Sequence, residues 1–237
     1  MAAPTALVIG GSGFLGSHVV RQLVADGVPT RVMLRASSST LGIDDLDVER
    51  CYGDVLDAEG LRAAMAGVAD VYYCVVDTRA WLRDPAPLVR TNVEGLRVVL
   101  DVAATMPLNR FVFTSSLVTL AISPNRLVTE ADPHNWVDRG GAYVASRLAA
   151  EQLLLSYVRD RGVPGIAMCV SNTYGSRDHL PTPHGQLVAL AARGKLPFYF
   201  RGAGSDVVAI DDAARALVLA ASKGRIGERY FVGERWM

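Results

Sequence analysis

The stretch Ala6-Leu7-Val8-Ile9-Gly10-Gly11-Ser12-Gly13-Phe14-Leu15-Gly16 decides the fold of this chain. Its first four residues are apolar on both faces, which is expected of a central strand in a parallel sheet. Apolar residues then recur at helical spacing until Asp26-Gly27, a helix stop signal. A strand, a glycine turn and a helix in this order are typical of a dinucleotide-binding loop.

The three glycines of this loop have separate physical roles. Gly10 allows a tight turn, Gly13 allows a pyrophosphate to approach the backbone, and Gly16 lets the helix pack closely on the strand. The helix that starts at Phe14-Leu15 offers unpaired N–H groups and a partial positive charge to the phosphates. The spacing is Gly-x-x-Gly-x-x-Gly, and the alternative interpretation is a plain glycine-rich turn.

Length and composition limit the classes of protein to be considered. The 237 residues are 50% hydrophobic, enough for one substantial core and a small appended lobe. Lys plus Arg and Asp plus Glu number 24 each, so no net charge attracts nucleic acid or an anionic membrane. There is no apolar run of membrane-spanning length and no room for a signal peptide before the first strand, so we expect a cytoplasmic protein. We interpret Cys51, Cys74 and Cys169 as buried thiols, and the four histidines show no metal-ligand spacing.

Strand and helix patterns alternate along most of the chain. The predicted strands span residues 6–9, 30–35, 48–52, 70–76, 111–116 and 165–170, and the predicted helices span 58–66, 88–104 and 143–158. This alternation predicts an α/β fold, a doubly wound parallel sheet of the Rossmann type with a small or truncated C-terminal lobe. We expect a dinucleotide-binding domain over residues 1–170. Residues 171–237 would form a partial substrate lobe interleaved with late strands of the sheet.

Two polar residues at strand ends point to the cofactor. Arg35 ends the second strand, where a carboxylate favours NAD and a basic residue accommodates the 2′-phosphate of NADP. We therefore expect NADP, with NAD as the alternative if Arg35 is only an exposed strand-end residue. Asp54-Val55 follows the third strand, where the carboxylate of Asp54 can accept from an adenine amino group or simply start a turn.

Two further segments suggest chemistry. Thr114-Ser115-Ser116 places hydroxyl groups at the carboxyl end of the fifth strand. Tyr143 and Arg147 lie four residues apart at the start of a predicted helix, so they share one helix face.

With these motifs the chain resembles the extended short-chain dehydrogenase/reductase family over essentially its whole length, with features of dihydroflavonol reductases and hopanoid-associated sugar epimerases. The matching residues are Gly10, Gly13, Phe14 and Gly16, Gly53-Asp54, Asn92-Val93-Glu94-Gly95, Thr114-Ser115-Ser116, Tyr143, Ser146, Tyr174-Gly175 and Val208-Ala209-Ile210-Asp211-Asp212. Residues 175–185 look especially similar to the sugar epimerases.

The resemblance implies a role for each catalytic residue. Tyr143 would be the acid/base that passes a proton to a carbonyl oxygen, and Ser116 would hold that oxygen by a hydrogen bond. A tyrosine needs a nearby cation because its ordinary pKa is about 10. The family supplies a lysine there, but this chain has Arg147, which keeps the charge and cannot readily release a proton. We expect cofactor binding to be kept and catalysis to be reduced or altered.

The chain departs from the family pattern at two other places near the expected nicotinamide site. Val170 stands where relatives usually have proline, and Val75 with Val76 replaces small residues after the fourth strand. Family members are also commonly longer, which puts substrate specificity in question.

We expect an enzyme, an NADP-dependent oxidoreductase that transfers hydride to or from a small-molecule ketone, aldehyde or secondary alcohol. Two alternatives are a sugar-nucleotide epimerase or dehydratase with tightly bound NAD and a catalytically weak NAD(P)-binding protein. For a sugar-nucleotide diphosphate, the only obvious cations are Arg177, Lys195 and Arg201. The resemblance also implies a homodimer formed through the helices predicted over 88–104 and 143–158.

Overall fold

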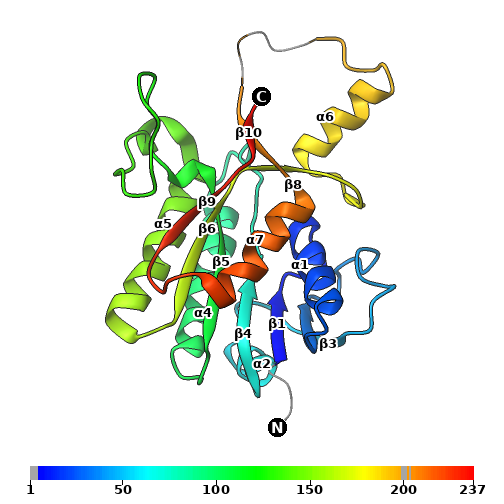
Figure 1. Cartoon of the computed structure of the whole chain (residues 1–237), viewed down its shortest axis with the longest axis vertical. Coiled ribbons are helices and arrows are strands. Elements are labelled where there is room, and N and C mark those ends of the chain that lie inside the picture. The colour runs from blue at the N-terminus through cyan, green and yellow to red at the C-terminus, as the bar shows by residue number, and fades with distance from the viewer. Residues whose placement is uncertain (1–4, 199–201, 203) are drawn as a thin grey trace.

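Seven parallel strands form the central sheet of the computed structural model, which describes residues 5–198, 202 and 204–237 (Figure 1). In spatial order the strands are β3 (Glu49–Tyr52), β2 (Thr30–Leu34), β1 (Thr5–Ile9), β4 (Val68–Tyr73), β5 (Arg110–Ser116), β6 (Gly165–Val170) and β9 (Arg229–Val232). The strand order reverses between β1 and β4, where open α/β sheets place their ligand crevice. The predicted doubly wound α/β fold is confirmed.

Helices cover both faces of this sheet. Helices α1 (Phe14–Ala25) and α7 (Ile210–Lys223) pack on one face, and α2 (Ala58–Met65), α4 (Gly95–Ala103) and α5 (Val137–Arg161) pack on the other. Successive residues along a strand face these two cores alternately. Leu7 and Ile9 contact the α2–α4–α5 side, whereas Ala6 and Val8 contact the α1–α7 side. Both faces of β1 are therefore apolar because both are buried.

The structure differs from the predicted elements at the carboxyl ends of the sheet. The strand predicted over 70–76 ends at Tyr73, so Cys74 to Val76 form a loop. The helix predicted over 88–104 is three pieces, α3 (Ala86–Val89), a π-helical turn (Arg90–Glu94) and α4. Helix α5 starts earlier than predicted, at Val137, but Gly141 interrupts it with a φ of +70°. The regular part of α5 therefore begins next to Tyr143, close to the predicted start.

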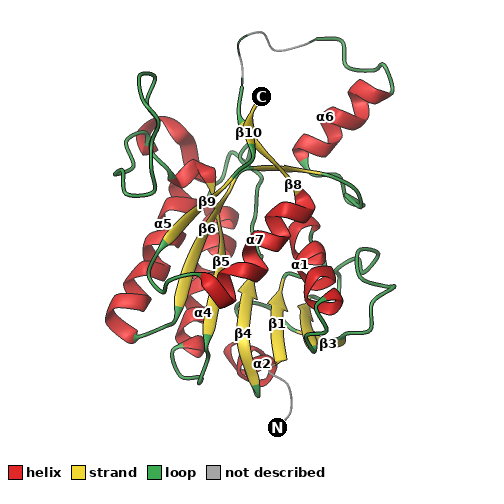
Figure 2. Cartoon of the chain, in the orientation of Figure 1, coloured by secondary structure: helices red, strands yellow, loops and turns green. Residues whose placement is uncertain are grey.

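A smaller sheet lies beyond the carboxyl ends of the main strands (Figure 2). It contains β7 (Asn172–Tyr174), β8 (Asp206–Ala209) and β10 (Arg235–Trp236), with β8 in the centre. Helix α6 (Pro183–Ala192) stands beside it and has no buried residue. Arg201, one of the cations considered for a diphosphate, lies outside the described residues.

Two further expectations concern the cysteines and the membrane-spanning segments. All three cysteines are free, but only Cys169 is buried, whereas Cys51 and Cys74 are half-buried. In the described ranges, no helix has the length and hydropathy that crossing a bilayer requires.

Candidate functional site

The glycine loop between β1 and α1 has the geometry of an anion site. Gly10 has a φ of +84°, and the N–H of Gly13 donates to the Gly10 carbonyl oxygen at 3.1 Å. A Cβ on Gly16 would collide with that same oxygen, so only glycine allows α1 to pack here. No side chain caps α1, whose first backbone N–H groups remain available for an anion.

A cavity of about 850 Å³ opens beside this loop. It is lined by the glycine loop, the ends of β1 and β2, the segment 53–56, the loop 74–79 and the π-helical turn. Its size lies within the usual range for small-molecule and cofactor sites, roughly 300–1,000 Å³. The cavity is therefore large enough for an extended ligand that crosses the carboxyl ends of β1 and β4.

Half of the twelve predicted cofactor-binding residues line this cavity. These six are Gly10, Gly13, Arg35, Asp54, Val55 and Val75. Phe14, Leu15 and Gly16 lie behind the loop. The Phe14 ring meets the His18 ring edge-on at 5.5 Å, Leu15 packs on the α1–α7 core, and Gly16 is buried. None of these three residues is among those that line the cavity, and what they offer a ligand is their backbone N–H groups at the start of α1.

Arg35 and Asp54 both line the cavity, but they differ in their hydrogen bonding. The Arg35 guanidinium has no ion pair or hydrogen bond with any residue that the structure describes, and the residue is exposed. The Asp54 carboxylate instead accepts from the backbone N–H of Leu56 at 2.9 Å. Asp54 thus starts a turn, which was one of the two roles predicted for it. The residue also lines the cavity. Arg35 is a free cation for a ligand anion.

Ser116 and Val170 meet at the ends of adjacent strands. They are paired in the register of β5 and β6, so the backbone that follows each strand leaves the sheet at the same level. The Ser116 hydroxyl accepts weakly from the Val118 N–H at 3.4 Å, at the start of the short 3-10 turn Leu117–Thr119. Val170 is 6% exposed and packs in the core. Of this pair, only Ser116 presents a reactive group.

Arg147 is an unusual group in this protein because a full guanidinium is buried, with 1% of the residue exposed. One nitrogen, Nη2, donates to the Thr114 carbonyl oxygen, and the guanidinium lies 5.1 Å from the centre of the Phe113 ring. Nε and Nη1 are buried without a hydrogen-bond partner among the described residues. Burial lowers the Arg147 pKa, and the nearby Tyr143 acts in the opposite direction. Unpartnered buried donors of this kind are costly and favour a ligand oxygen.

Tyr143 lies one turn before Arg147 on α5 and is half-buried. Neither residue is among those that line the cavity. Arg147 adjoins it, because Thr114, the acceptor of Arg147, also donates its hydroxyl to the Cys74 sulfur at 3.4 Å. Cys74 lines the cavity. The structure therefore brings Arg147 to the ends of β4 and β5 beside the glycine-loop cavity.

Several residues to which the sequence assigned no role connect the cavity wall to α5. Asn92, in the π-helical turn, is fully buried. Its side chain accepts from the Asp77 N–H at 2.7 Å and donates to the Asp77 carbonyl and to the Ser146 hydroxyl, each at 3.0 Å. Ser146 in turn donates to the Tyr143 carbonyl at 2.8 Å. Asn92 belonged to a recognised motif, but no local signal indicated which segments its amide joins.

Arg79 is a second cation on the cavity wall. Its guanidinium donates to both carboxylate oxygens of Asp77, and this bonding lowers the Asp77 pKa. Unlike Arg35, it is already paired, so Arg35 remains the better candidate for a ligand phosphate.

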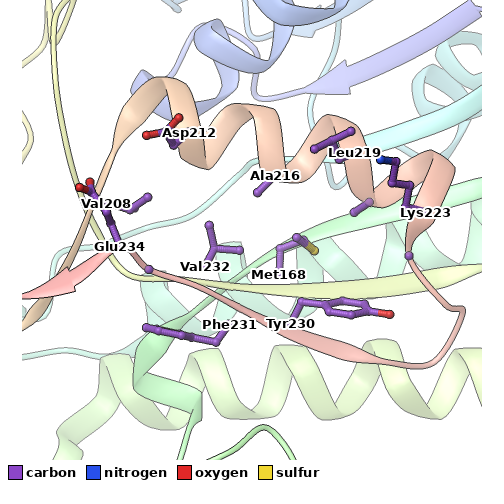
Figure 3. Close-up of a pocket in the computed structure, with 13 residues that line it drawn as sticks. Met168, Val208, Asp212, Ala216, Leu219, Lys223, Tyr230, Phe231, Val232 and Glu234 are labelled. Atoms are coloured by element: carbon purple, nitrogen blue, oxygen red, sulfur yellow. The ribbon is translucent and has the colours of Figure 1, made fainter.

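A second cavity, of about 500 Å³, lies between α7 and β9 and contains none of the predicted site residues (Figure 3). Met168 and Val232 form its floor, and charged residues stand at its rim, namely Asp212, Lys223 and Glu234. The floor carries no nucleophile or acid/base group. In the described part of the chain, no cluster of three or more His, Cys, Asp or Glu side chains could hold a metal ion. All the predicted cofactor-binding residues that line either cavity line the first one.

The first cavity fits a dinucleotide. The glycine loop gives a pyrophosphate an open approach, since a Cβ on Gly13 would meet only the Gly10 oxygen, at 3.4 Å. Arg35 lines the cavity and has no partner among the described residues. The two donors of Arg147 that lack a described partner are buried behind Thr114, whose hydroxyl contacts Cys74 of the cavity wall. These donors match the oxygen-rich phosphate and ribose groups of such a ligand.

Comparisons with known proteins agree with this geometry. A Synechocystis protein named, provisionally, as a dihydroflavonol 4-reductase is 29% identical over 231 residues, covering 95% of this chain and 66% of the relative. Sterol demethylase protein B of Methylococcus capsulatus is 31% identical over 232 residues, covering 96% and 69%. This chain thus spans about two thirds of the length of these relatives.

A solved structure extends the comparison to a bound cofactor. The dTDP-glucose 4,6-dehydratase DesIV of Streptomyces venezuelae, crystallised as a double mutant with NAD, superposes with a TM-score of 0.85. It is 28% identical, and the match covers 98% of this chain and 76% of that one. A family profile also matches residues 6–233. On the evidence of its fold, its glycine-loop cavity and these matches, the chain belongs to the NAD dependent epimerase/dehydratase family.

Proposed function

We propose that this protein is an NADP-dependent oxidoreductase that interconverts a small ketone or aldehyde and the corresponding alcohol. The observation that carries the proposal is the buried Arg147, one turn from Tyr143 and bonded to the end of β5, beside a cavity that the glycine loop and Arg35 line. Family membership supports oxidoreductase-type chemistry with NAD(P), because reductases and dehydratases both occur among the relatives.

Each residue has one task in this proposal. The phenol oxygen of Tyr143 gives a proton to the carbonyl oxygen, or takes one from the alcohol. The Ser116 hydroxyl donates a hydrogen bond to the same oxygen and holds it in place. The bound dinucleotide supplies or accepts the hydride. Arg147 keeps a positive charge near the phenol, but it does not itself release a proton.

The preference for NADP rests on Arg35. Its exposed guanidinium has no partner among the described residues, and Ser38 lines the same part of the cavity. A guanidinium with nearby hydroxyl groups suits a phosphate monoester. NAD is the alternative, since the DesIV structure was determined with NAD.

A second candidate function is epimerisation or dehydration of a nucleotide-linked sugar, which the family name and the DesIV match favour. We use the name small lobe for α6, the sheet of β7, β8 and β10, and the loops between them. Its described part offers few cations for a diphosphate. Arg177 lies 3.8 Å from Asp45, and Lys195 is exposed near the end of α6. We therefore rank this function second. Purification with tightly held NAD, and epimerisation without added cofactor, would favour it.

The proposal is tested by assaying the purified protein with NADPH and with NADH against a panel of ketones and aldehydes. Tyr143→Phe removes the proton donor and should lower kcat by about 10²- to 10⁴-fold, the usual contribution of general acid–base catalysis. Tyr52→Phe is the matched control, because Tyr52 is 62% exposed on β3 and lines neither cavity. No turnover in the parent protein, or full turnover in Tyr143→Phe, would contradict the proposal.

A further inference from the structure

A buried carboxylate on α5, Glu151, lies outside both cavities and has no part in the chemistry described above. The residue is 2% exposed. Its Oε2 atom accepts a short hydrogen bond from the Ser115 hydroxyl, lies 2.8 Å from the Thr119 hydroxyl and accepts from the Cys169 thiol at 3.3 Å. Burial raises the pKa of Cys169 to about 12, and the charge of Glu151 acts in the same direction as the second-largest cause. This thiol therefore stays protonated and can donate. Polar groups from β5, from the turn after it and from β6 thus converge on one carboxylate oxygen.

The other oxygen of this carboxylate pairs with a cation from the far edge of the sheet. Arg229 on β9 places its Nε atom 2.8 Å from Glu151 Oε1. Its two remaining nitrogens donate to the Glu130 carbonyl at 3.0 Å and the Thr119 carbonyl at 3.1 Å. The guanidinium therefore joins α5, the loop after β5 and the edge strand. Glu151 and Arg229 are separated by 78 positions in sequence, and neither lines a cavity.

The location of this ion pair relates it to the proposed catalytic groups. Glu151 follows Arg147 by one helical turn and Tyr143 by two on the same helix. Its hydroxyl partners belong to the segment that contains Ser116. Ser115 precedes that residue, and the Thr119 hydroxyl lies 2.8 Å from the Ser116 carbonyl oxygen. The network thus connects the helix that bears Tyr143 to the turn that bears Ser116.

Stability alone is a weak reason for such a pair. Removing two charges from water is expensive, and apolar side chains of similar volume often serve a core equally well. A pair with several additional hydrogen bonds, however, fixes one arrangement of the elements that it joins. The spacing of Tyr143 and Ser116 needs such a constraint, because an error of about 1 Å between reacting groups can cost about 100-fold in rate.

We propose that Glu151 and Arg229 are positioning residues that hold α5 in register with the end of β5, so that Tyr143 and Ser116 reach the same substrate oxygen. This inference rests on the proposed function for the roles of Tyr143 and Ser116. The ion pair lies outside both cavities. Its loss should therefore reduce the rate of the chemical step and leave cofactor affinity intact.

The test compares Glu151→Gln, Arg229→Gln and the double variant with the parent protein. Each single variant should lower kcat by about 10- to 100-fold, as expected of misplaced groups, with the NADPH dissociation constant, followed by fluorescence, within about twofold of the parent value. The double variant should be no slower than the slower single variant, because both changes break one unit. Arg229→Lys keeps the charge and should retain more activity than Arg229→Gln.

Asp101→Asn is the control, because it breaks a different ion pair to the same helix, α5. Asp101 on α4 accepts from Arg161 and Tyr157 of α5, at 2.6 and 2.9 Å, in a half-exposed ion pair away from both cavities. Its loss should leave kcat unchanged. A folded Glu151→Gln variant with parental kcat would overturn the inference, and so would a fall of kcat in proportion to a loss of NADPH affinity.

Hydrogen exchange provides a readout that does not need turnover. In Glu151→Gln, amides of residues 114–121 and 141–151 should exchange faster, whereas amides of β1 and α1 should not change. Unchanged exchange in the first two segments would refute the positioning role even if the parent protein has no carbonyl-reducing activity. An inactive parent with faster exchange in the variant would instead refute the proposed function and leave the coupling of α5 to β5 supported.

Discussion

The glycine-loop cavity and the small upper lobe are built in contrasting ways. The cavity lies on the ends of strands whose residues are almost wholly buried, and α1 behind it has six buried residues. In the lobe, α6 has none, and Leu180, Leu187, Val188 and Leu190 are exposed. The glycine-loop cavity is therefore tied to the packing of the core, whereas α6 is only loosely tied to it. A short insertion or substitution can change the lobe without disturbing the sheet.

The largest effect at the glycine-loop cavity is expected from Gly16→Val. Any side chain at this position collides with the Gly10 carbonyl oxygen, so the loop and α1 must separate. We expect a loss of dinucleotide affinity of at least about 100-fold, together with a lower melting temperature, as overpacking costs about 1–3 kcal/mol or more. Titration of NADPH by fluorescence and thermal unfolding measure the two effects.

Gly13→Ala is the matched control for this change. Its Cβ would make only an ordinary contact with the Gly10 oxygen, so the fold should remain and only the phosphate approach should narrow. Equal losses of stability in both variants would contradict the separate roles given to the two glycines, Gly16 in helix packing and Gly13 in the approach of the phosphate.

A smaller effect is expected from Arg147→Met, which removes the buried cation. Its loss takes away two buried N–H donors that suit a ligand oxygen, together with the positive charge near Tyr143. We expect kcat at pH 7 to fall by about tenfold or more. Arg147→Lys keeps the charge and should retain more activity than Arg147→Met. Equal kcat values in all three proteins would mean that this cation has no part in the reaction.

Arg35→Ala probes the outer end of the cavity. The guanidinium is unpaired among the described residues, so its loss should not disturb the fold. The NADPH dissociation constant should rise by about tenfold, which corresponds to about 1.4 kcal/mol, while that of NADH should change little. Arg62→Ala, an exposed site on α2, removes the same charge elsewhere and serves as the control. Equal losses for both nucleotides would argue against recognition of a 2′-phosphate.

The smallest effect should come from the lobe. Leu187→Ala on α6, at a residue 42% exposed, should change the unfolding free energy by less than about 0.5 kcal/mol. Leu100→Ala on α4, where the leucine is fully buried, should cost about 2–5 kcal/mol. Chemical denaturation of both variants compares the two regions directly. A large cost at Leu187 would show that α6 is packed in solution against a surface that it does not contact here.

Much of the fold could be predicted because its signals are local. The run 6–16, the buried strands and the pair Tyr143 and Arg147 at helical spacing each identify an element from a few adjacent residues. The end of β4 at Tyr73 and the π-helical turn around Asn92 could not be predicted this way. Both depend on contacts between distant segments, such as the bonds of Asn92 to Asp77 and Ser146. The partnership of Glu151 with Arg229 has the same character, since sequence spacing gives no indication of which buried charges meet.

One consequence concerns the thiol in the wall of the cavity. Cys74 accepts from the Thr114 hydroxyl, and burial raises its pKa to about 11. At neutral pH this shift disfavours the thiolate, which is the form that attacks electrophiles and peroxides. We therefore expect Cys74 to react slowly with alkylating agents and peroxides, although its residue lines the cavity.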